Sequence, residues 1–422
     1  MVYLSLLKVV YLTQVFELED DFGSDRHFYF CRKLVEAGHE VVAITSNVNY
    51  KTSQLKYKQR GFQPIHIRHE GMDVYYVFST PRFQRNFPKR ILYFLTFFVL
   101  AFGLRKKVKG AQAIYAVSTP LTVGLLGYLL SLLSRSRFIL EVTDVWPDVH
   151  IAMGFLRNRS LIRILRQLEL FCYAKADSIV ALTRGIQRNI QSKIRRKEKV
   201  ILITNGVDRT LFNPNPGWEA EIQGLKDRWN LRGKFIGLYL GAHGLYNSLQ
   251  DIVEAAPFLR EDPEIQLVLI GDGDEKARLL ARARALGLNN ISFIPPIPRR
   301  QAPLYLRLAE VFLLTNLKGK FFDLNLPNKL FDYLASARPI IFAGAGESAD
   351  LIRESRSGKV IEPHNPLALA SAIREFKAMP ARVREAMGKD GQAYVLAHYE
   401  RDSLSRIFLA LVEKTSPGKR DS

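Results

Sequence analysis

The chain has 422 residues, 47% of them hydrophobic, so it is long enough for about two domains with buried cores. Its formal net charge of +20 indicates an anionic partner, such as nucleic acid, acidic lipid or a phosphorylated substrate. Two cysteines, Cys31 and Cys172, are too few for a disulfide framework or a zinc cluster, which favours a reducing compartment.

The first predicted elements form a β-turn-α-β unit. The apolar run Lys8–Thr13 predicts a strand rather than a secretory signal, because it is short and contains a lysine. A polar turn with Gly23 follows, and a helix should begin near Ser24, a good N-cap residue, followed by Asp25. With a second strand at Glu40–Ser46, this order is typical of a doubly wound sheet, whose ligands gather at the carboxyl ends of the strands. Gly23, Ser24 and Asp25 are therefore candidate site residues, with simple turn chemistry as the alternative.

The segment 85–109 combines a long apolar run with positive charge. Fourteen uncharged residues, Ile91–Leu104, lie between clusters of lysine and arginine and include five aromatic side chains. As a helix this run would be roughly 21 Å long, whereas a bilayer core needs about 30 Å, so it should not span a membrane. Its composition suits a helix that lies in the membrane interface. A core helix of the first domain with solvated basic flanks is the alternative.

A candidate catalytic carboxylate follows the predicted strand Phe138–Val142. The chain continues there as Asp-Val-Trp-Pro, starting at Asp144. A charged residue just past the carboxyl end of a central strand lies where doubly wound sheets place their chemistry. Asp144 is therefore predicted to be a polar active-site group and Trp146 to shape the cleft. The alternative is that Asp144 caps the next helix and Trp146 fills a core.

The predicted fold class is α/β, with two doubly wound parallel-sheet domains. The turn Asn205-Gly206 ends the first half, and the linker is predicted in the Pro/Asn-rich segment that follows. The predicted divisions are a first domain at 1–212, a linker at 213–217, a second domain at 218–399, a terminal helix at 400–415 and a disordered tail at 416–422.

The second domain begins with a strand and a glycine-containing loop. Gly241 and Gly244 allow close backbone approach in this loop, whose exposed N–H groups suit a diphosphate. His243 lies between them and is either a group that faces the donor or an ordinary turn histidine. After the next strand, Gly271 and Asp272 form a similar turn. Asp272-x-Asp274 is interpreted as a turn and helix N-cap rather than a metal site, so no metal or cofactor is expected.

The strongest signal lies between residues 319 and 341. Pro327 suits the last loop position before a helix or its first turn, which places Asn328 and Lys329 at a helix N-terminus, where free N–H groups and the helix dipole favour an anion. Asp332 lies one turn further along, where a carboxylate would accept hydrogen bonds from a vicinal diol such as ribose.

These motifs together resemble the retaining GT-B glycosyltransferases, in particular the fucosamine-transferase-like bacterial branch that extends lipid-linked surface polysaccharides. The resemblance rests on Pro-Asn-Lys-Leu-Phe-Asp-Tyr-Leu-Ala from Pro327, on Asp-Val-Trp-Pro from Asp144 and on Asn-Gly-Val-Asp from Asn205. It implies two Rossmann-like domains that face each other across a cleft, with a terminal helix that returns to the first domain.

The resemblance also implies roles for the candidate residues. Lys329, Asn328 and the glycine loops would bind the diphosphate of a UDP- or GDP-linked sugar, and Asp332 its ribose. Asp144 and His243 would act on the sugar or acceptor. On the acceptor side, the resemblance implies contacts from the following residues: Gly23, Ser24, Asp25 and Trp146.

This chain departs from the family at three positions. Many relatives have Arg and Lys where this chain has His243 and Asn247, which shifts the cationic role towards Lys329 and the backbone. Relatives also carry a glutamate pair eight residues apart, of which Leu324 replaces the first, so a sugar contact from that carboxylate does not carry over.

The predicted function is transfer of a sugar to a polyprenyl-diphosphate-linked acceptor at the inner face of the plasma membrane. The alternatives are a non-hydrolysing sugar-nucleotide epimerase, which shares the architecture, and a basic nucleic-acid-binding protein. The second alternative rests on charge alone, because the chain contains no recognised nucleic-acid motif. The sequence does not give the base, the sugar or the oligomeric state.

Overall fold

A computed structural model describes residues 6–18, 21, 24–50, 53–82, 87–213, 215 and 217–414. The predicted site residue Gly23 and the predicted tail at 416–422 lie outside these described residues. The chain divides into two compact units, each with its own sheet. The described first unit consists of residues 6–18, 25–204 and 405–414, and the second of residues 21, 24 and 205–404. The chain enters the long segment of the second unit after Thr204, upstream of the linker that the sequence predicts at 213–217.

The first unit contains an eight-stranded sheet in the order β3-β4-β2-β1-β5-β6-β7-β8. All neighbouring pairs are parallel except β3 and β4. Its strands are β1 (Lys8–Leu12), β2 (Glu40–Ser46), β3 (Ile65–His69), β4 (Met72–Val77), β5 (Ala113–Val117), β6 (Arg137–Val142), β7 (Ser178–Ala181) and β8 (Val200–Leu202). Its helices are α1 (Arg26–Glu36), α2 (Phe87–Gly103), α3 (Leu121–Ser134), α4 (Asp148–Ala152), α5 (Arg159–Lys175), α6 (Arg184–Gln191) and the part of α15 (Arg401–Glu413) that follows Leu404.

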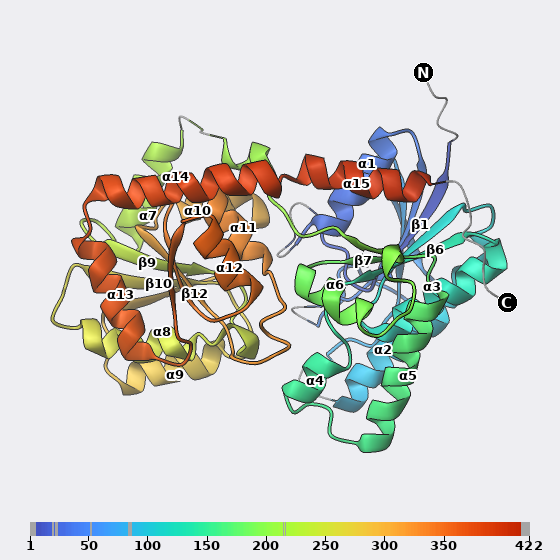
Figure 1. Ribbon diagram of the computed structural model, residues 1–422, viewed down its shortest axis with the longest axis horizontal. Coiled ribbons are helices and arrows are strands. Elements are labelled where there is room, and N and C mark those ends of the chain that lie inside the picture. Colours follow the sequence, from blue (N-terminus) through green and yellow to red (C-terminus); the bar gives the residue numbers. More distant parts are fainter. Residues whose placement is uncertain are drawn as a thin grey trace. The chain divides into compact units, whose positions relative to one another are not determined.

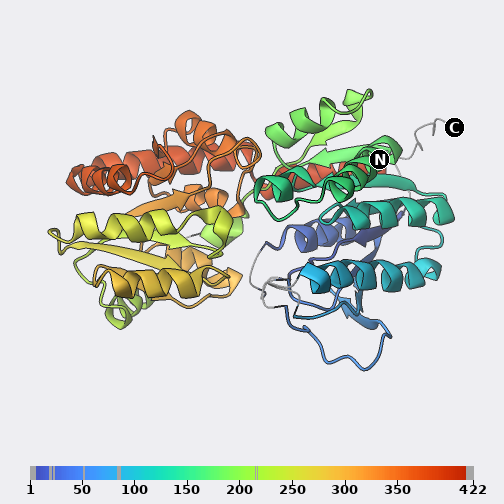
Figure 2. The ribbon, with the colours of Figure 1, turned by 90° about the horizontal axis from the view of Figure 1, so that it is seen from below.

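Helices cover both faces of this sheet because successive residues of a strand point to opposite faces. Tyr115 of β5 meets Phe408 of α15, with ring centroids 5.1 Å apart. The next residue, Ala116, points to α3, where a Cβ at Gly127 would lie only 2.6 Å from it. Helix α3 packs against both α2 and α5, and Figure 2 shows these three helices, cyan to green, running alongside one another.

One local prediction for the first unit needs correction, and one pair of strands was missed. Helix α1 begins at Arg26, and its N-cap position is Asp25 rather than Ser24. The hairpin β3–β4 was not predicted, although its turn at Glu70-Gly71 has positive φ at both residues, a conformation that favours a tight two-residue connection.

A buried ion pair ties α1 to the centre of the first sheet. Arg26 Nε donates to Glu141 Oε1 at 3.2 Å, and the Tyr115 hydroxyl donates to the other carboxylate oxygen. Burial alone would raise the pKa of Glu141, but Arg26, His27 and Tyr115 outweigh it and hold the pKa below its usual range. The Arg26 guanidinium also donates to the carbonyl oxygens of Ile203 and Thr204, so it fixes the last residues of the first unit before the chain enters the second.

Both cysteines are buried in the first unit. Cys31 lies on α1 and Cys172 on α5, and each is a free thiol with no exposed surface. Burial raises the pKa of the Cys31 thiol well above its usual value and that of Cys172 to about 12.

The second unit contains a six-stranded, fully parallel sheet in the order β11-β10-β9-β12-β13-β14. Helices α8, α9 and α13 pack on one face, and α7, α10, α11, α12 and α14 on the other (Figure 1). The strands are β9 (Phe235–Leu240), β10 (Ile265–Ile270), β11 (Ile291–Ile294), β12 (Val311–Thr315), β13 (Ile340–Ala343) and β14 (Gly358–Ile361). The helices are α7 (Trp218–Arg228), α8 (Gln250–Ala255), α9 (Lys276–Ala285), α10 (Ala302–Leu306), α11 (Asn328–Ala335), α12 (Glu347–Glu354), α13 (Pro366–Ala378) and α14 (Ala381–His398). The predicted α/β class with two doubly wound domains is confirmed.

Candidate active site

Two loops meet backbone to backbone at the carboxyl edge of the second sheet. One follows β9 from Gly241 and the other follows β10 from Gly271. A Cβ at Gly271 would lie 2.0 Å from the Gly241 carbonyl oxygen, and a Cβ at Gly273 would lie 2.5 Å from that of His243. The His243 amide donates to the Asp272 carbonyl at 2.8 Å, and the His243 carbonyl accepts from the Glu275 amide at 2.9 Å. No side chain fits between these loops at Gly271 or Gly273, so glycine is required there.

Lys329 reaches these loops from the first turn of α11. Its Nζ donates to the Tyr239 hydroxyl and to Asn247 Oδ1, both at 2.5 Å. Its Cε would lie 2.9 Å from a Cβ at Gly241, which therefore leaves space for the lysine. Tyr239 and Asn247 each donate to the Ala242 carbonyl, at 2.7 and 2.9 Å, and so anchor the lysine to the loop. Sequence reasoning missed Tyr239, because a tyrosine within an apolar strand is expected to be a core residue.

A second lysine lies beside the same loops. Lys276, the first residue of α9, donates from Nζ to the Gly271 carbonyl at 2.6 Å. Sequence reasoning missed Lys276, which lies two residues after Asp274. Asp272 behaves as the turn residue that was expected, since its Oδ1 accepts from the Gly273 amide at 2.9 Å.

His243 is a neutral imidazole at pH 7. Its side chain has no exposed surface, and its ring centroid lies 6.0 Å from that of Tyr239 and 6.4 Å from that of Phe293. Burial, followed by the charge of Lys276, lowers the pKa of His243 to about 4. The Ile270 carbonyl lies near enough to raise the pKa slightly, but neither ring nitrogen makes a hydrogen bond of ordinary geometry with the described residues.

Asp332 forms a bidentate ion pair that the sequence did not predict. Arg299 donates from Nη1 to Oδ2 at 2.6 Å and from Nη2 to Oδ1 at 2.7 Å, and both side chains are largely buried. Arg299 follows Pro298 at the carboxyl edge of the sheet, where ligands bind. This position is the one feature of the sequence that could have marked Arg299 as a site residue. Because an ionised carboxylate offers about four lone-pair sites, this pair uses half of the acceptor capacity of Asp332.

The other two residues predicted to bind the donor, Asn328 and Gly244, make fewer contacts that define the site. Asn328 is the first residue of α11 and follows Pro327 at the N-cap position. Gly244 has a negative φ, and a Cβ there would meet nothing closer than 3.8 Å, so its backbone does not require glycine. It lines a cavity of about 340 Å³ together with three carboxylates: Asp251, Glu254 and Glu275.

In the first unit, Asp144 and Trp146 follow the carboxyl end of β6 as predicted. Asp144 is half-buried, and burial raises its pKa above the usual range. Asp144 does not cap α4, whose N-cap position is Pro147. The Trp146 ring lies 6.1 Å from that of Phe94 on α2 and 3.8 Å from that of His150.

Ser24 and Asp25 are both described. Asp25 is buried at the start of α1, whereas Ser24 groups with the second unit.

Of the predicted site residues, the structure gathers Gly241, His243, Gly271, Asp272 and Lys329 at one edge of the second sheet. Among the described residues, no group of three or more His, Cys, Asp or Glu is arranged to hold a metal ion.

Comparison with known families identifies both halves of the chain. Residues 28–206 match the family "Glycosyl transferase 4-like domain", and residues 224–394 match "Glycosyl transferases group 1". These two matches together cover most of the chain.

Curated relatives agree with these matches. The putative colanic acid biosynthesis glycosyl transferase WcaI of Escherichia coli K12 is 26% identical over 82% of this chain and 86% of its own. The probable glycosyltransferase WbjE of Pseudomonas aeruginosa is 24% identical over 71% of this chain and 75% of its own. These matches do not favour the epimerase alternative, and the narrower fucosamine-transferase-like branch stays a prediction.

Solved structures show the same fold. Anabaena HepE in complex with UDP and glucose superimposes with a TM-score of 0.72 at 14% identity, covering 97% of this chain and all of that one. Sucrose-phosphate synthase from Thermosynechococcus elongatus superimposes with a TM-score of 0.74 at 16% identity, covering 96% of this chain and 98% of that one. From the two family matches and the fold together, the protein belongs to the group 1 glycosyltransferases with the GT-B fold.

Proposed function

We propose that this glycosyltransferase moves a sugar from a UDP- or GDP-linked donor to a polyprenyl-diphosphate-linked glycan during bacterial surface polysaccharide synthesis. The reaction proceeds with retention at the anomeric carbon and without a metal ion. The observation that carries the proposal is the position of Lys329, at a helix N-terminus and beside a loop with little side-chain bulk. HepE was solved with UDP, which makes UDP the first nucleotide to test.

The donor diphosphate binds between α11 and the loop from Gly241. The first N–H groups of a helix have no partner within the helix, and its dipole favours an anion. Lys329 and Lys276 supply positive charge on the two sides of the loop contact. As the bond to the sugar breaks, the charge that develops on the leaving diphosphate is stabilised by donors already in place.

Front-face attack fits this charge distribution. The leaving diphosphate assists deprotonation of the acceptor hydroxyl, so no carboxylate nucleophile of the kind used by retaining glycosidases is needed. Asp144 orients the sugar or the acceptor, and Trp146, Ser24 and Asp25 contribute to the acceptor side. His243 supports the donor site from beneath the loop as a buried neutral group, so it adds no charge to that of the lysines.

The carboxylate of Asp332 binds the ribose diol. Arg299 occupies one lone-pair site on each of its oxygens and fixes the orientation of the carboxylate, while the remaining sites accept from two adjacent hydroxyls. Arg299 is thus a positioning residue for the nucleotide.

The outer face of α2 binds the membrane. Tyr93 and Phe97 are buried, whereas Ile91, Leu92, Leu95 and Val99 are 41–63% exposed at helical spacing. The helix therefore has one face in the core and one apolar face exposed, and the exposed face supports the proposed contact with a membrane.

The surroundings of α2 support contact with an anionic leaflet. Exposed lysines and an arginine follow its C-terminal end, at residues 105–107 and 109. Helix α5 packs against α3, as α2 does. Phe155, before α5, and Ile164, on it, are also 50% and 63% exposed, and arginines lie close to them in sequence at 157, 159, 163 and 166. Among the described helices, none is long and apolar enough to cross a membrane. An amphipathic helix with basic flanks binds at the interface of an anionic membrane, and this would place the enzyme at the cytoplasmic face.

Replacement of Lys329 by alanine should weaken nucleotide binding. Titration calorimetry with UDP and with GDP should show saturable binding of one of them to the wild type. The loss of a charge-assisted hydrogen bond should raise its Kd roughly tenfold to a hundredfold. Lys359→Ala is the matched control, because Lys359 pairs with Glu375 at the surface of the same unit. Absence of binding to either nucleotide in folded protein, or equal effects of the two substitutions, would contradict the donor site.

The ribose contact can be tested with the nucleotide that binds and its 2′,3′-dideoxy analogue. Wild type should bind the analogue roughly tenfold more weakly, because two hydroxyls that donate to a carboxylate are missing. In Asp332→Asn this penalty should shrink, whereas Asp350→Asn, at an exposed carboxylate of α12, should keep it. An undiminished penalty in Asp332→Asn would show that the ribose binds elsewhere.

The charge state of His243 predicts a pH dependence of stability. Its pKa is about 4 in the folded protein and about 6.5 when unfolded, so its contribution is complete above pH 6.5 and is lost as the pH falls towards 4. The loss is at most about 3 kcal/mol. In urea unfolding at pH 7 and pH 4.5, His243→Gln should lose less stability than the wild type. The control is His66→Gln, at an exposed histidine. Equal losses for wild type and His243→Gln would contradict a neutral His243.

Membrane binding should depend on the exposed face of α2. Wild type should float with vesicles rich in anionic lipid at low salt, and Leu95→Glu/Val99→Glu should remain unbound. Leu367→Glu is a control at an exposed leucine of the second unit. If wild type fails to float at low salt, or if the double variant still floats, the assignment of this face is wrong.

A further inference from the structure

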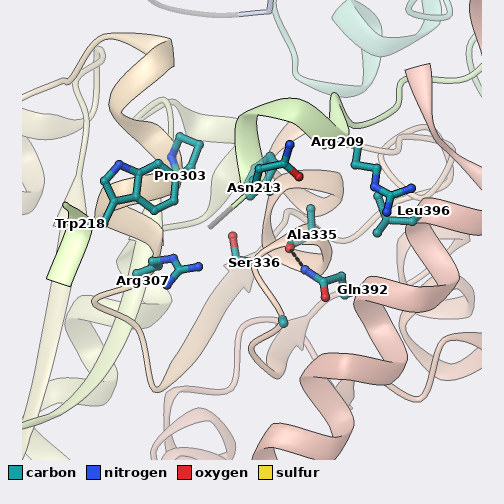
Figure 3. A pocket seen from close by; sticks show the side chains of 11 residues that line it. Arg209, Asn213, Trp218, Pro303, Arg307, Ala335, Ser336, Gln392 and Leu396 are labelled. Carbon is teal, nitrogen blue, oxygen red and sulfur yellow. Dashed lines mark hydrogen bonds between the residues drawn. The ribbon is translucent and has the colours of Figure 1, made fainter. Parts of the chain in front are cut away.

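A second cavity in the same unit lies away from the proposed nucleotide site. Figure 3 shows this cavity, which has a volume of about 340 Å³ and is bounded by the C-terminal end of α11, the start of α7, α10, α14 and the turn Arg209–Phe212. Lys329 lies at the other end of α11, an eight-residue helix about 12 Å long. None of the residues predicted to bind the donor lines this cavity.

The charge of the cavity favours an anion. Its described lining includes Arg209 and Arg307 but no aspartate or glutamate. The two arginines occupy opposite walls (Figure 3), and neither guanidinium makes a hydrogen bond or ion pair within the described part of the chain. A planar guanidinium is suited to bidentate binding of a phosphate.

One wall is apolar and flat. The Trp218 indole and Pro303 form this wall, and the Arg307 guanidinium lies 5.2 Å from the Trp218 ring centroid. This cation–π contact orients Arg307 along the wall without using its hydrogen-bond donors. An apolar surface next to two cations suits a ligand with both an anionic group and a compact, partly apolar body.

The floor of the cavity offers hydrogen-bond partners for hydroxyl groups. Gln392 donates from Nε2 to the Ala335 carbonyl at 2.6 Å, which fixes the amide and leaves its Oε1 as an acceptor. Ser336 donates its hydroxyl proton to the Asp332 carbonyl at 2.7 Å, so its oxygen also remains an acceptor. The Asn213 side chain, also on the lining, makes no hydrogen bond with the described residues.

Another cavity of this unit, also of about 340 Å³, has a different charge. Its described lining includes three carboxylates, those of Asp251, Glu254 and Glu275, beside Arg278 and His364, so carboxylates outnumber the arginine and disfavour an anion. Size alone therefore does not distinguish the two cavities, whereas the charge of their side chains does.

We propose that the cavity between Arg209 and Arg307 binds a sugar phosphate. The phosphate lies between the two guanidinium groups, the sugar ring packs on Trp218, and its hydroxyls donate to Gln392 and Ser336. This site is separate from the nucleotide site and does not depend on the proposed donor or acceptor.

Titration calorimetry with glucose 6-phosphate tests the proposal. Glucose and inorganic phosphate, the two parts of that molecule, are titrated separately for comparison. Wild type should bind the whole molecule saturably and more tightly than either half. Arg209→Gln and Arg307→Gln should each weaken binding roughly tenfold or more, because each removes a charged partner of the phosphate. Arg353→Gln, at an exposed arginine of α12, is the matched control and should have no effect.

Lys329→Ala separates this site from the nucleotide site, since it should weaken the nucleotide and leave glucose 6-phosphate unaffected. The proposal is overturned if wild type does not bind glucose 6-phosphate, if both cavity arginines are dispensable, or if Lys329→Ala weakens the sugar phosphate equally. Phosphate alone binding as tightly as glucose 6-phosphate would overturn the sugar assignment. Circular dichroism of each variant confirms that it is folded.

Discussion

The contact between two backbone segments, from Gly241 to His243 and from Gly271 to Gly273, determines the geometry of the candidate active site. At Gly271 and Gly273 the space for a side chain is already occupied by a carbonyl group of the other segment. The two loops are therefore positioned by main-chain atoms and form a fixed backbone frame. The surrounding side chains pack against this frame. Lys329 from one helix and Lys276 from another both reach this frame.

This arrangement gives a physical account of how the chain departs from its family. The resemblance found in the sequence implies cations where this chain has His243 and Asn247. Here Asn247 accepts a hydrogen bond from Lys329 and so holds the lysine beside the loop. His243 is neutral because it is buried close to Lys276. The positive charge that the resemblance implies within the loop is thus supplied in this protein by lysines of the helices α9 and α11.

Much of the fold could be predicted because it depends on local patterns. Alternation of apolar strands and helices gave both doubly wound units, and the Pro-Asn-Lys run gave the N-terminus of α11. The pairing of Arg299 with Asp332 could not be read in the same way, since 33 residues separate them and only the folded sheet brings them together. The burial of His243 likewise depends on Phe293, from a distant strand. For α2, composition alone does not say which face packs on the core and which is exposed.

The two cysteines have a practical consequence for spectroscopy. Cys31 and Cys172 are fully buried, and their raised pKa values leave a negligible fraction of thiolate at neutral pH. Thiol-directed dyes and spin labels should therefore leave the native chain almost unmodified. A single cysteine introduced on the surface would be the one fast-reacting thiol, so probes can be attached at chosen positions without first removing the natural cysteines.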